Sequence, residues 1–215
     1  MNKQHPENNF SYAQLDILVK EYALTKTQTD MLSRYLELLI EWNNKFNLTA
    51  ITDPKGIIQY HFNDSLALSK YIDFTTIQST ADIGTGGGFP GIPLKILFPH
   101  LQTILIEVSN KKRTFLEYVI NEFKLDNVIV YPHDWRTFLR NTEYNVDYFF
   151  ARASLQPEEL IRIFKPTSVY RNATLIYWAS KQWVPEKKEA PFLEKEVSYT
   201  IDNKQRKFVF FQNLS

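Results

Sequence analysis

Glycine is concentrated at one place in this chain. Five of its six glycines fall between Gly84 and Gly91, within the run Asp82-Ile-Gly-Thr-Gly-Gly-Gly-Phe-Pro-Gly. Glycine adopts positive φ readily and leaves no Cβ between the backbone and an approaching group. A short apolar run precedes the cluster, and a helix-compatible stretch, residues 92–98, follows it. The pattern predicts a strand, a glycine loop and a helix, the arrangement in which backbone N–H groups hold an adenosine-bearing cofactor.

Asp82 decides which cofactor this loop favours. The spacing Gly86-x-Gly88-x-x-Gly91 also satisfies the dinucleotide pattern, but that pattern alone is weak. A carboxylate at the end of the first strand would repel a pyrophosphate, whereas it suits the ammonium and sulfonium groups of S-adenosylmethionine. We therefore expect S-adenosylmethionine, and not NAD, to be bound by Asp82, Gly84, Gly86 and Gly88. A tight turn without a ligand is the remaining alternative.

Composition sets limits on the class of protein. The 215 residues, 44% of them hydrophobic, suit one compact unit with a modest extension. No stretch approaches the roughly 20 apolar residues that span a bilayer, and the polar N-terminus lacks the apolar segment of a signal peptide. The absence of cysteine excludes disulfides and fits a cytoplasmic protein, and we expect no metal site. With a net charge of +1, any nucleic acid must be bound by a local basic patch.

The pattern of apolar residues divides the chain in two. Residues 1–10 have the composition of a disordered tail, and residues 11–78 are expected to form a helical extension. Three- and four-residue apolar spacings predict helices at 11–23, 27–47 and 54–71. Residues 79–215 are expected to form the cofactor-binding core, because β-rich runs and helical runs alternate there.

This alternation predicts a particular α/β fold. Helices are expected at 92–98, 111–124 and 157–165, and residues 181–196 are expected to form a solvated loop. The last two strands read as a hairpin, which matches a Rossmann-like class I methyltransferase: a seven-stranded, mostly parallel sheet, flanked by helices, whose last strand inserts antiparallel. The predicted strands are 79–84, 103–108, 127–132, 146–151, 173–179, 194–201 and 206–211.

Three polar residues stand at predicted strand ends, where ligands bind in parallel sheets. Glu107 lies 23 residues after Gly84 and is expected to accept hydrogen bonds from ribose hydroxyls, with a surface charge as the alternative. Asp134 follows the third strand, where it would contact adenine or cap a helix at 135–140. Arg152, between two alanines, is expected to reach the cleft, with a structural salt bridge as the alternative.

Several motifs together resemble a known family, the RsmG (GidB) family of bacterial small-subunit ribosomal RNA methyltransferases, which modify guanine at N7. The resemblance runs from about residue 32 to residue 182, most of the chain. The glycine–proline run and the Asn-Leu-Thr motif are specific when they occur together. The matching segments are Trp42-Asn43-x-x-x-Asn47-Leu48-Thr49, His61-x-x-Asp64-Ser65, the run from Asp82 to Leu94, Lys111-Lys112 with Phe115-Leu116, and Arg152-Ala153.

The resemblance implies roles for individual residues. Gly84 and Phe89 would line the methyl-donor pocket, Trp135 and Arg136 would lie beside the adenine, and Arg152 would face the cleft. Lys181 is similar to the lysine of the family's Lys-Gly pair after the fifth strand. The sequence departs from the family's usual residues at Glu107-Val108, Trp135-Arg136 and Lys181-Gln182.

The implied reaction is methylation of guanine N7 in 16S ribosomal RNA or the small subunit, by an S-adenosylmethionine-dependent enzyme that we expect to be a monomer. The methylated base gains positive charge, so a carboxylate over the cleft would favour the transition state, and Asp64 is our candidate. Arg152 and Lys181 complete the candidate catalytic set. Two alternatives stay open: a methyltransferase for a small molecule or protein, and a non-catalytic RNA- or ribosome-binding protein.

Overall fold

The structure is a computed structural model that describes residues 8–214. Residues 8–10, predicted to belong to a disordered tail, are part of helix α1 (Asn8–Tyr22), and the rest of the predicted tail lies outside the described residues. Helix α2 (Lys26–Phe46) has Thr25 as its N-cap, and Thr25 forms a reciprocal capping box with Gln28. Both helices lie where the apolar spacings predict them.

The third predicted helix is one helical stretch with a change of winding inside it. It consists of α3 (Pro54–Ile57), the π-helix η1 (Ile58–Asn63), α4 (Asp64–Leu66) and the 3₁₀-helix η2 (Ala67–Lys70). Asp53 caps its start by accepting a hydrogen bond from the Gly56 N–H. Periodicity alone does not reveal a π-helical turn, and such turns occur often at functional sites.

The sheet confirms the predicted fold class. It has seven strands in the order β3-β2-β1-β4-β5-β7-β6, of which β1 to β5 are parallel and β7 is antiparallel between β5 and β6. The strands are β1 (Ser79–Ile83), β2 (Gln102–Ile106), β3 (Val128–Tyr131), β4 (Tyr148–Arg152), β5 (Thr174–Ser180), β6 (Leu193–Ile201) and β7 (Lys204–Phe211).

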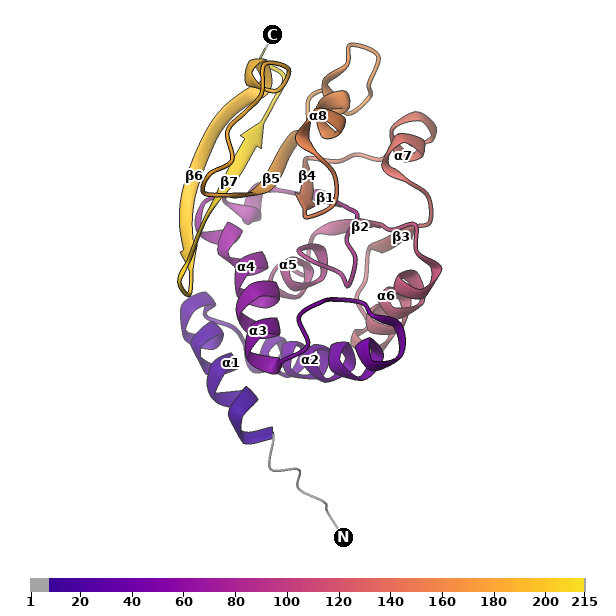
Figure 1. The fold of residues 1–215 in the computed structure, drawn as a ribbon. Helices are drawn as coiled ribbons and strands as arrows, with labels where there is room; N and C mark the ends of the chain where they lie inside the picture. The colour runs from indigo at the N-terminus through magenta and orange to yellow at the C-terminus, as the bar shows by residue number, and fades with distance from the viewer. Residues whose placement is uncertain (1–7, 215) are drawn as a thin grey trace.

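Helices cover both faces of this sheet (Figure 1). Strand β6 starts at Leu193, so the predicted loop 181–196 is shorter than expected, and the short helix η5 (Ala190–Phe192) precedes the strand. Two short elements, α8 (Pro157–Leu160) and η4 (Ile161–Phe164), replace the predicted helix 157–165. The remaining helical elements are η3 (Phe74–Thr76), α5 (Gly91–Leu97), α6 (Asn110–Phe123), α7 (Trp135–Asn141), α8 (Pro157–Leu160) and η4 (Ile161–Phe164).

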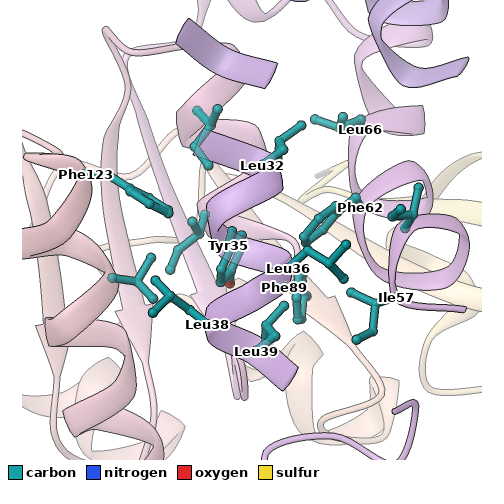
Figure 2. Close-up of a cluster of buried hydrophobic side chains, with 14 of the residues drawn as sticks. Leu32, Tyr35, Leu36, Leu38, Leu39, Ile57, Phe62, Leu66, Phe89 and Phe123 are labelled. Atoms are coloured by element: carbon teal, nitrogen blue, oxygen red, sulfur yellow. The ribbon is translucent and has the colours of Figure 1, made fainter. Parts of the chain in front are cut away.

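The N-terminal helices share a hydrophobic core with the sheet. The apolar stripe of α2, including Leu32, Leu36 and Leu39, packs in one cluster with buried residues of α5 and α6. Tyr35 lies at the centre of this cluster, where its ring stacks on Phe62 and Phe89, as Figure 2 shows. Its hydroxyl donates a hydrogen bond to the Gly87 carbonyl oxygen, so α2 holds the glycine loop directly.

Candidate functional site

The glycine loop joins β1 to α5 and contains three positive φ angles: +66° at Gly84, +62° at Gly86 and +96° at Gly88. A Cβ on Gly84 would lie 2.6 Å from Ser154 Cβ, and one on Gly88 would lie 2.7 Å from Ile92 Cδ1. A Cβ on Gly86, by contrast, would come no closer than 4.0 Å to its nearest neighbour, the Gly84 carbonyl oxygen. Gly84 and Gly88 therefore permit close packing, whereas Gly86 borders open space.

Asp82 lies beneath this loop and organises it. Its Oδ2 accepts hydrogen bonds from Thr85 Oγ1 at 2.7 Å and from the Gly91 N–H at 2.8 Å. The carboxylate is buried, which raises its pKa to about 6, and its Oδ1 has no hydrogen-bond partner among the described residues. The carboxylate is not among the residues that line the cavity above the loop. Asp82 therefore supports the loop, and its direct contact with a cofactor stays a prediction.

A cavity of about 530 Å³ opens at the carboxyl ends of β1, β2 and β4. Glu107 holds the loop at its edge: Oε2 accepts from the Gly86 N–H at 3.0 Å, and Oε1 accepts from the Ser109 N–H at 2.8 Å. Each carboxylate oxygen keeps a second lone pair for another donor. The cavity is lined by Ile83, Gly84, Ile106, Glu107, Val108, Lys112, Asp134, Trp135, Arg136, Ala153, Ser154, Leu155 and Glu159.

The far wall of this cavity is the start of α7. Asp134 caps the helix by accepting from the Thr137 N–H at 2.8 Å, which is the capping alternative left open from the sequence. The Trp135 ring is buried against Phe149, and the exposed Arg136 makes a two-point ion pair with Glu159 at 2.8 and 2.9 Å. All three predicted adenine-side residues therefore line the cavity, with Asp134 also fixing α7.

The resemblance implies that Phe89 lines the methyl-donor pocket, and this role stays a prediction. Its ring is buried, stacks on Tyr35 and on His61, and is absent from the residues lining the 530 Å³ cavity. The Arg152 guanidinium lies over it, 5.3 Å from the ring centre. The phenylalanine turns into the core because α2 and η1 supply the aromatic and aliphatic partners that cover it.

A buried charge cluster lies beside the cavity, and Asp64 is its centre. The Asp64 side chain is fully buried, which corrects the expectation that its carboxylate is open to the cleft. Its Oδ2 accepts from Arg152 Nη1 at 3.1 Å and from Arg206 Nη1 at 2.5 Å, and its Oδ1 accepts from the Tyr199 hydroxyl at 2.8 Å. Asp64 thus orients two arginines, one on β4 and one on β7.

His61 fixes Arg152 from the other side. Burial and the Arg152 guanidinium lower the pKa of His61 to about 3, so the ring is neutral. Arg152 Nη2 donates to Nδ1 of His61 at 3.0 Å, which assigns the proton to Nε2, 2.7 Å from Thr49 Oγ1. Arg152 also donates to the Tyr60 carbonyl oxygen at 2.8 Å. The structural salt bridge, one of the two alternatives left open from the sequence, is therefore present, and the role of Arg152 in the cleft stays a prediction.

The motifs around His61, Asp82 and Arg152, which are separate in the sequence, lie close together in the structure, and a family comparison agrees with them. A family model described as rRNA small subunit methyltransferase G (GidB) matches residues 28–214. The chain belongs to this family. The family predicted from the glycine–proline run and the Asn-Leu-Thr motif is therefore confirmed.

Individual relatives carry the same description. A ribosomal RNA small subunit methyltransferase G of Geobacillus sp. (strain WCH70) is 36% identical over 207 residues, which cover 91% of this chain and 87% of that protein. The protein so named in Lysinibacillus sphaericus (strain C3-41) is 41% identical over 129 residues, 60% of this chain and 54% of that protein. In this second alignment, the chain spans about half the length of the relative.

Solved structures show the same fold at low identity. M. capricolum TrmK, in complex with S-adenosyl-homocysteine, is 14% identical with a TM-score of 0.55, over 71% of this chain and 68% of that chain. A SAM-dependent methyltransferase from Aquifex aeolicus is 15% identical with a TM-score of 0.54, over 77% and 97%. These likenesses establish the class I methyltransferase fold and nothing finer.

Two negative findings apply to residues 8–214. No helix there has the length and apolar character needed to cross a membrane. In the same residues, no group of three or more His, Cys, Asp or Glu side chains is placed to hold a metal ion.

Two members of the charge cluster, Arg206 and Tyr199, were not predicted from the sequence. The predicted role of Lys181 stays a prediction. Lys181 is exposed just after β5 and is not among the residues lining the 530 Å³ cavity. A signal for Arg206 existed. Because β7 is antiparallel, it begins at the edge where β5 ends, and Arg206 pairs in register with Ser180. A cation at the start of such a strand belongs to the ligand-binding edge of the sheet.

Proposed function

We propose that this chain is an S-adenosylmethionine-dependent methyltransferase that acts on N7 of a guanine in small-subunit (16S) ribosomal RNA. The observation that carries the proposal is Gly86: its N–H is held by Glu107, and open space lies where its Cβ would be. A backbone fixed in this way beside a cavity of about 530 Å³ suits close approach of a ligand. Membership of the family supports the choice of substrate.

The residues present fit the donor. Glu107 has lone pairs left for two ribose hydroxyls, and the cap of α7, with Asp134, Trp135 and Arg136, forms a wall for the adenine. Gly84 lines the same cavity, while Asp82 keeps the loop in shape from below. When bound, S-adenosylmethionine supplies a methyl group on a positively charged sulfur.

Guanine N7 carries a free lone pair at neutral pH, so its methylation needs no general base. The work left to the protein is to position the base in line with the methyl group and to exclude water. Ala153 lines both the donor cavity and a second cavity that also contains Arg152, so the two reactants would meet beside this residue. We assign Arg152 to the acceptor side.

Asp64 is a positioning residue in this proposal. Its carboxylate is buried under Arg152 and Arg206 and acts through them. Lys181, exposed at the end of β5, stands at the same edge of the sheet and is proposed to contact the RNA. A ribosomal substrate would place a monomeric enzyme in the cytoplasm.

Two measurements test the proposal. Calorimetry should show binding of S-adenosylmethionine and much weaker binding of NAD, and tighter binding of NAD would overturn the cofactor assignment. Radiolabelled methyl transfer should then be measured to undermethylated small ribosomal subunits, naked ribosomal RNA and cell extract. Labelling of protein or small molecules alone would indicate a different substrate, and donor binding with no transfer to any fraction would indicate a non-catalytic protein.

A further inference from the structure

The Asp64 cluster leaves positive charge uncompensated. Two guanidinium groups, those of Arg152 and Arg206, share the single carboxylate oxygen Oδ2. His61 is neutral because its pKa is lowered to about 3, so it adds no charge. The three charged side chains sum to one positive charge, and the most exposed of them is Arg206, whose side chain is 33% exposed.

A cavity of about 400 Å³ collects this charge together with a third cation, Lys204. Lys204 Nζ lies 3.9 Å from the centre of the Tyr60 ring. This contact is with a neutral ring, so it does not neutralise the charge of the lysine. Asp202 is near, since it accepts from the Tyr60 hydroxyl at 3.1 Å, but it is not among the lining residues. The lining residues are Arg152, Ala153, Tyr177, Trp178, Ala179, Ser180, Lys204, Gln205 and Arg206, with no carboxylate among them.

The donors of the two arginines are used differently. Arg152 donates to Tyr60, Asp64 and His61, so its fork is largely occupied within the protein. Arg206 donates Nη1 to Asp64, and the carboxylate orients this guanidinium, which belongs to a residue lining the cavity. An arginine oriented in this way offers a fixed fork that matches the oxygens of a phosphate group.

We propose that this cavity binds a backbone phosphate of the RNA next to the target nucleotide, with Arg206 and Lys204 as its ligands. The inference rests on the proposed function, because it takes RNA as the substrate. Ala153 connects the cavity to the donor cavity, and its φ of +53° turns the chain at their junction. A phosphate held on the β7 side would therefore bring the neighbouring base to the methyl donor. Arg152 and Asp64 support the site from behind.

The test uses the purified full chain and undermethylated small ribosomal subunits. Equilibrium binding is measured over a range of salt concentrations for the wild type, Lys204→Ala and Arg206→Gln. Each phosphate contact contributes about 0.7 to the slope of log K against log salt for single-stranded RNA. Each variant should flatten the slope by about that amount and weaken binding several-fold at low salt, with donor affinity measured by calorimetry unchanged. Arg206→Lys, which keeps the charge, should restore most of the slope.

Lys187→Ala is the matched control, because it removes an exposed lysine from the connection between β5 and β6. It should leave the slope unchanged. Wild-type slopes in both Lys204→Ala and Arg206→Gln would overturn the phosphate site, and so would a loss of donor affinity with RNA binding intact, which would assign the cavity to the donor's carboxylate. Competition by inorganic phosphate with no slope change would show a free-anion site instead. Failure of the wild type to methylate subunits it binds would count against the proposed function, not this site.

Discussion

The glycine loop and the arginine cluster are built in opposite ways. The loop is local: Asp82, Thr85 and Gly91 lie within ten residues and hold one another by short hydrogen bonds. The cluster is assembled from distant parts of the chain, since Asp64 accepts from residues on β4, β6 and β7. The glycine loop consists of backbone groups around one buried carboxylate, whereas the arginine cluster is a network of charged side chains.

This difference separates two kinds of sensitivity. A change at Gly86 is expected to act on the proposed ligand at close range, because the nearest neighbour of a Cβ there would be the Gly84 carbonyl oxygen, 4.0 Å away. A change in the arginine cluster is expected to act first on stability, because it leaves a buried charge without its partner. Each of the following variants tests one side of that distinction.

Gly86→Val is expected to have the largest effect, with no measurable binding of S-adenosylmethionine. Valine at φ +62° is strained, and its side chain would fill the space beside the cavity. Calorimetry measures the loss. Gly91→Ala is the control: its Cβ would lie 2.5 Å from Leu105 Cδ2, so it should lower the melting temperature while the folded fraction still binds. Normal donor binding by Gly86→Val would show that Gly86 does not belong to the donor site.

Asp64→Asn should lower the free energy of unfolding by about 3 kcal/mol, the low end of the range for breaking a buried ion pair. The reason is that Arg152 and Arg206 would keep their charges without a carboxylate between them. Denaturant unfolding measures it. Adding Arg206→Gln should recover part of the loss, because only one unpaired guanidinium then remains. A loss below about 1 kcal/mol would show that solvent already screens the cluster.

The pH dependence of stability should have opposite signs in the two regions. Burial raises the pKa of Asp82 to about 6, so the folded state binds more protons, and stability is lost as pH rises from about 4 to 6. The pKa of His61 is lowered to about 3, so stability is lost as pH falls from about 6.5 toward 3. Thermal unfolding of Asp82→Asn and His61→Gln between pH 4 and 7 checks this. Relative to wild type, the melting temperature of Asp82→Asn should rise as pH rises, and that of His61→Gln should rise as pH falls. Melting temperatures that follow the wild type in parallel across this pH range would contradict both pKa shifts.

Glu107→Gln should weaken donor binding by about 1.5–3 kcal/mol, the range for hydrogen bonds to charged groups. An amide has one acceptor oxygen, so it cannot serve the Gly86 N–H, the Ser109 N–H and a ribose together. Calorimetry gives the affinity, and Glu117→Gln on the exposed face of α6 provides the matched control. Unchanged affinity would show that the ribose is held elsewhere.

Arg152→Ala should reduce methyl transfer at least tenfold, about 1.4 kcal/mol in the barrier. The arginine is held by Tyr60, His61 and Asp64 at the edge of the second cavity, so its loss affects both stability and the acceptor side. Specific activity of the folded fraction and melting temperature should be measured on one preparation. Full specific activity with a lowered melting temperature would make the arginine purely structural.

The sequence predicted most of the fold because the signals for its elements are local. The apolar and β-rich runs predicted all seven strands, with ends within about two residues of the observed ones. The predicted loop 181–196 overlapped the predicted strand 194–201, and β6 begins at Leu193, so the loop was extended too far into residues that are mostly charged and exposed. The π-helical turn of η1 was missed because its hydrogen bonds, such as Asp64 N–H to the Gln59 carbonyl oxygen, leave no mark on apolar spacing.

By itself, the sequence determined the glycine loop, the acid at the end of β2 and the family, because each depends on residues adjacent along the chain. Only the tertiary structure decided that Phe89 faces the core, that Asp82 supports the loop from below and that Asp64 lies under two arginines. Those outcomes depend on which side chains the packing of α2, η1 and β7 brings into contact. A buried charge needs partners, and those of Asp64 come from distant parts of the chain, as far as 142 positions away at Arg206.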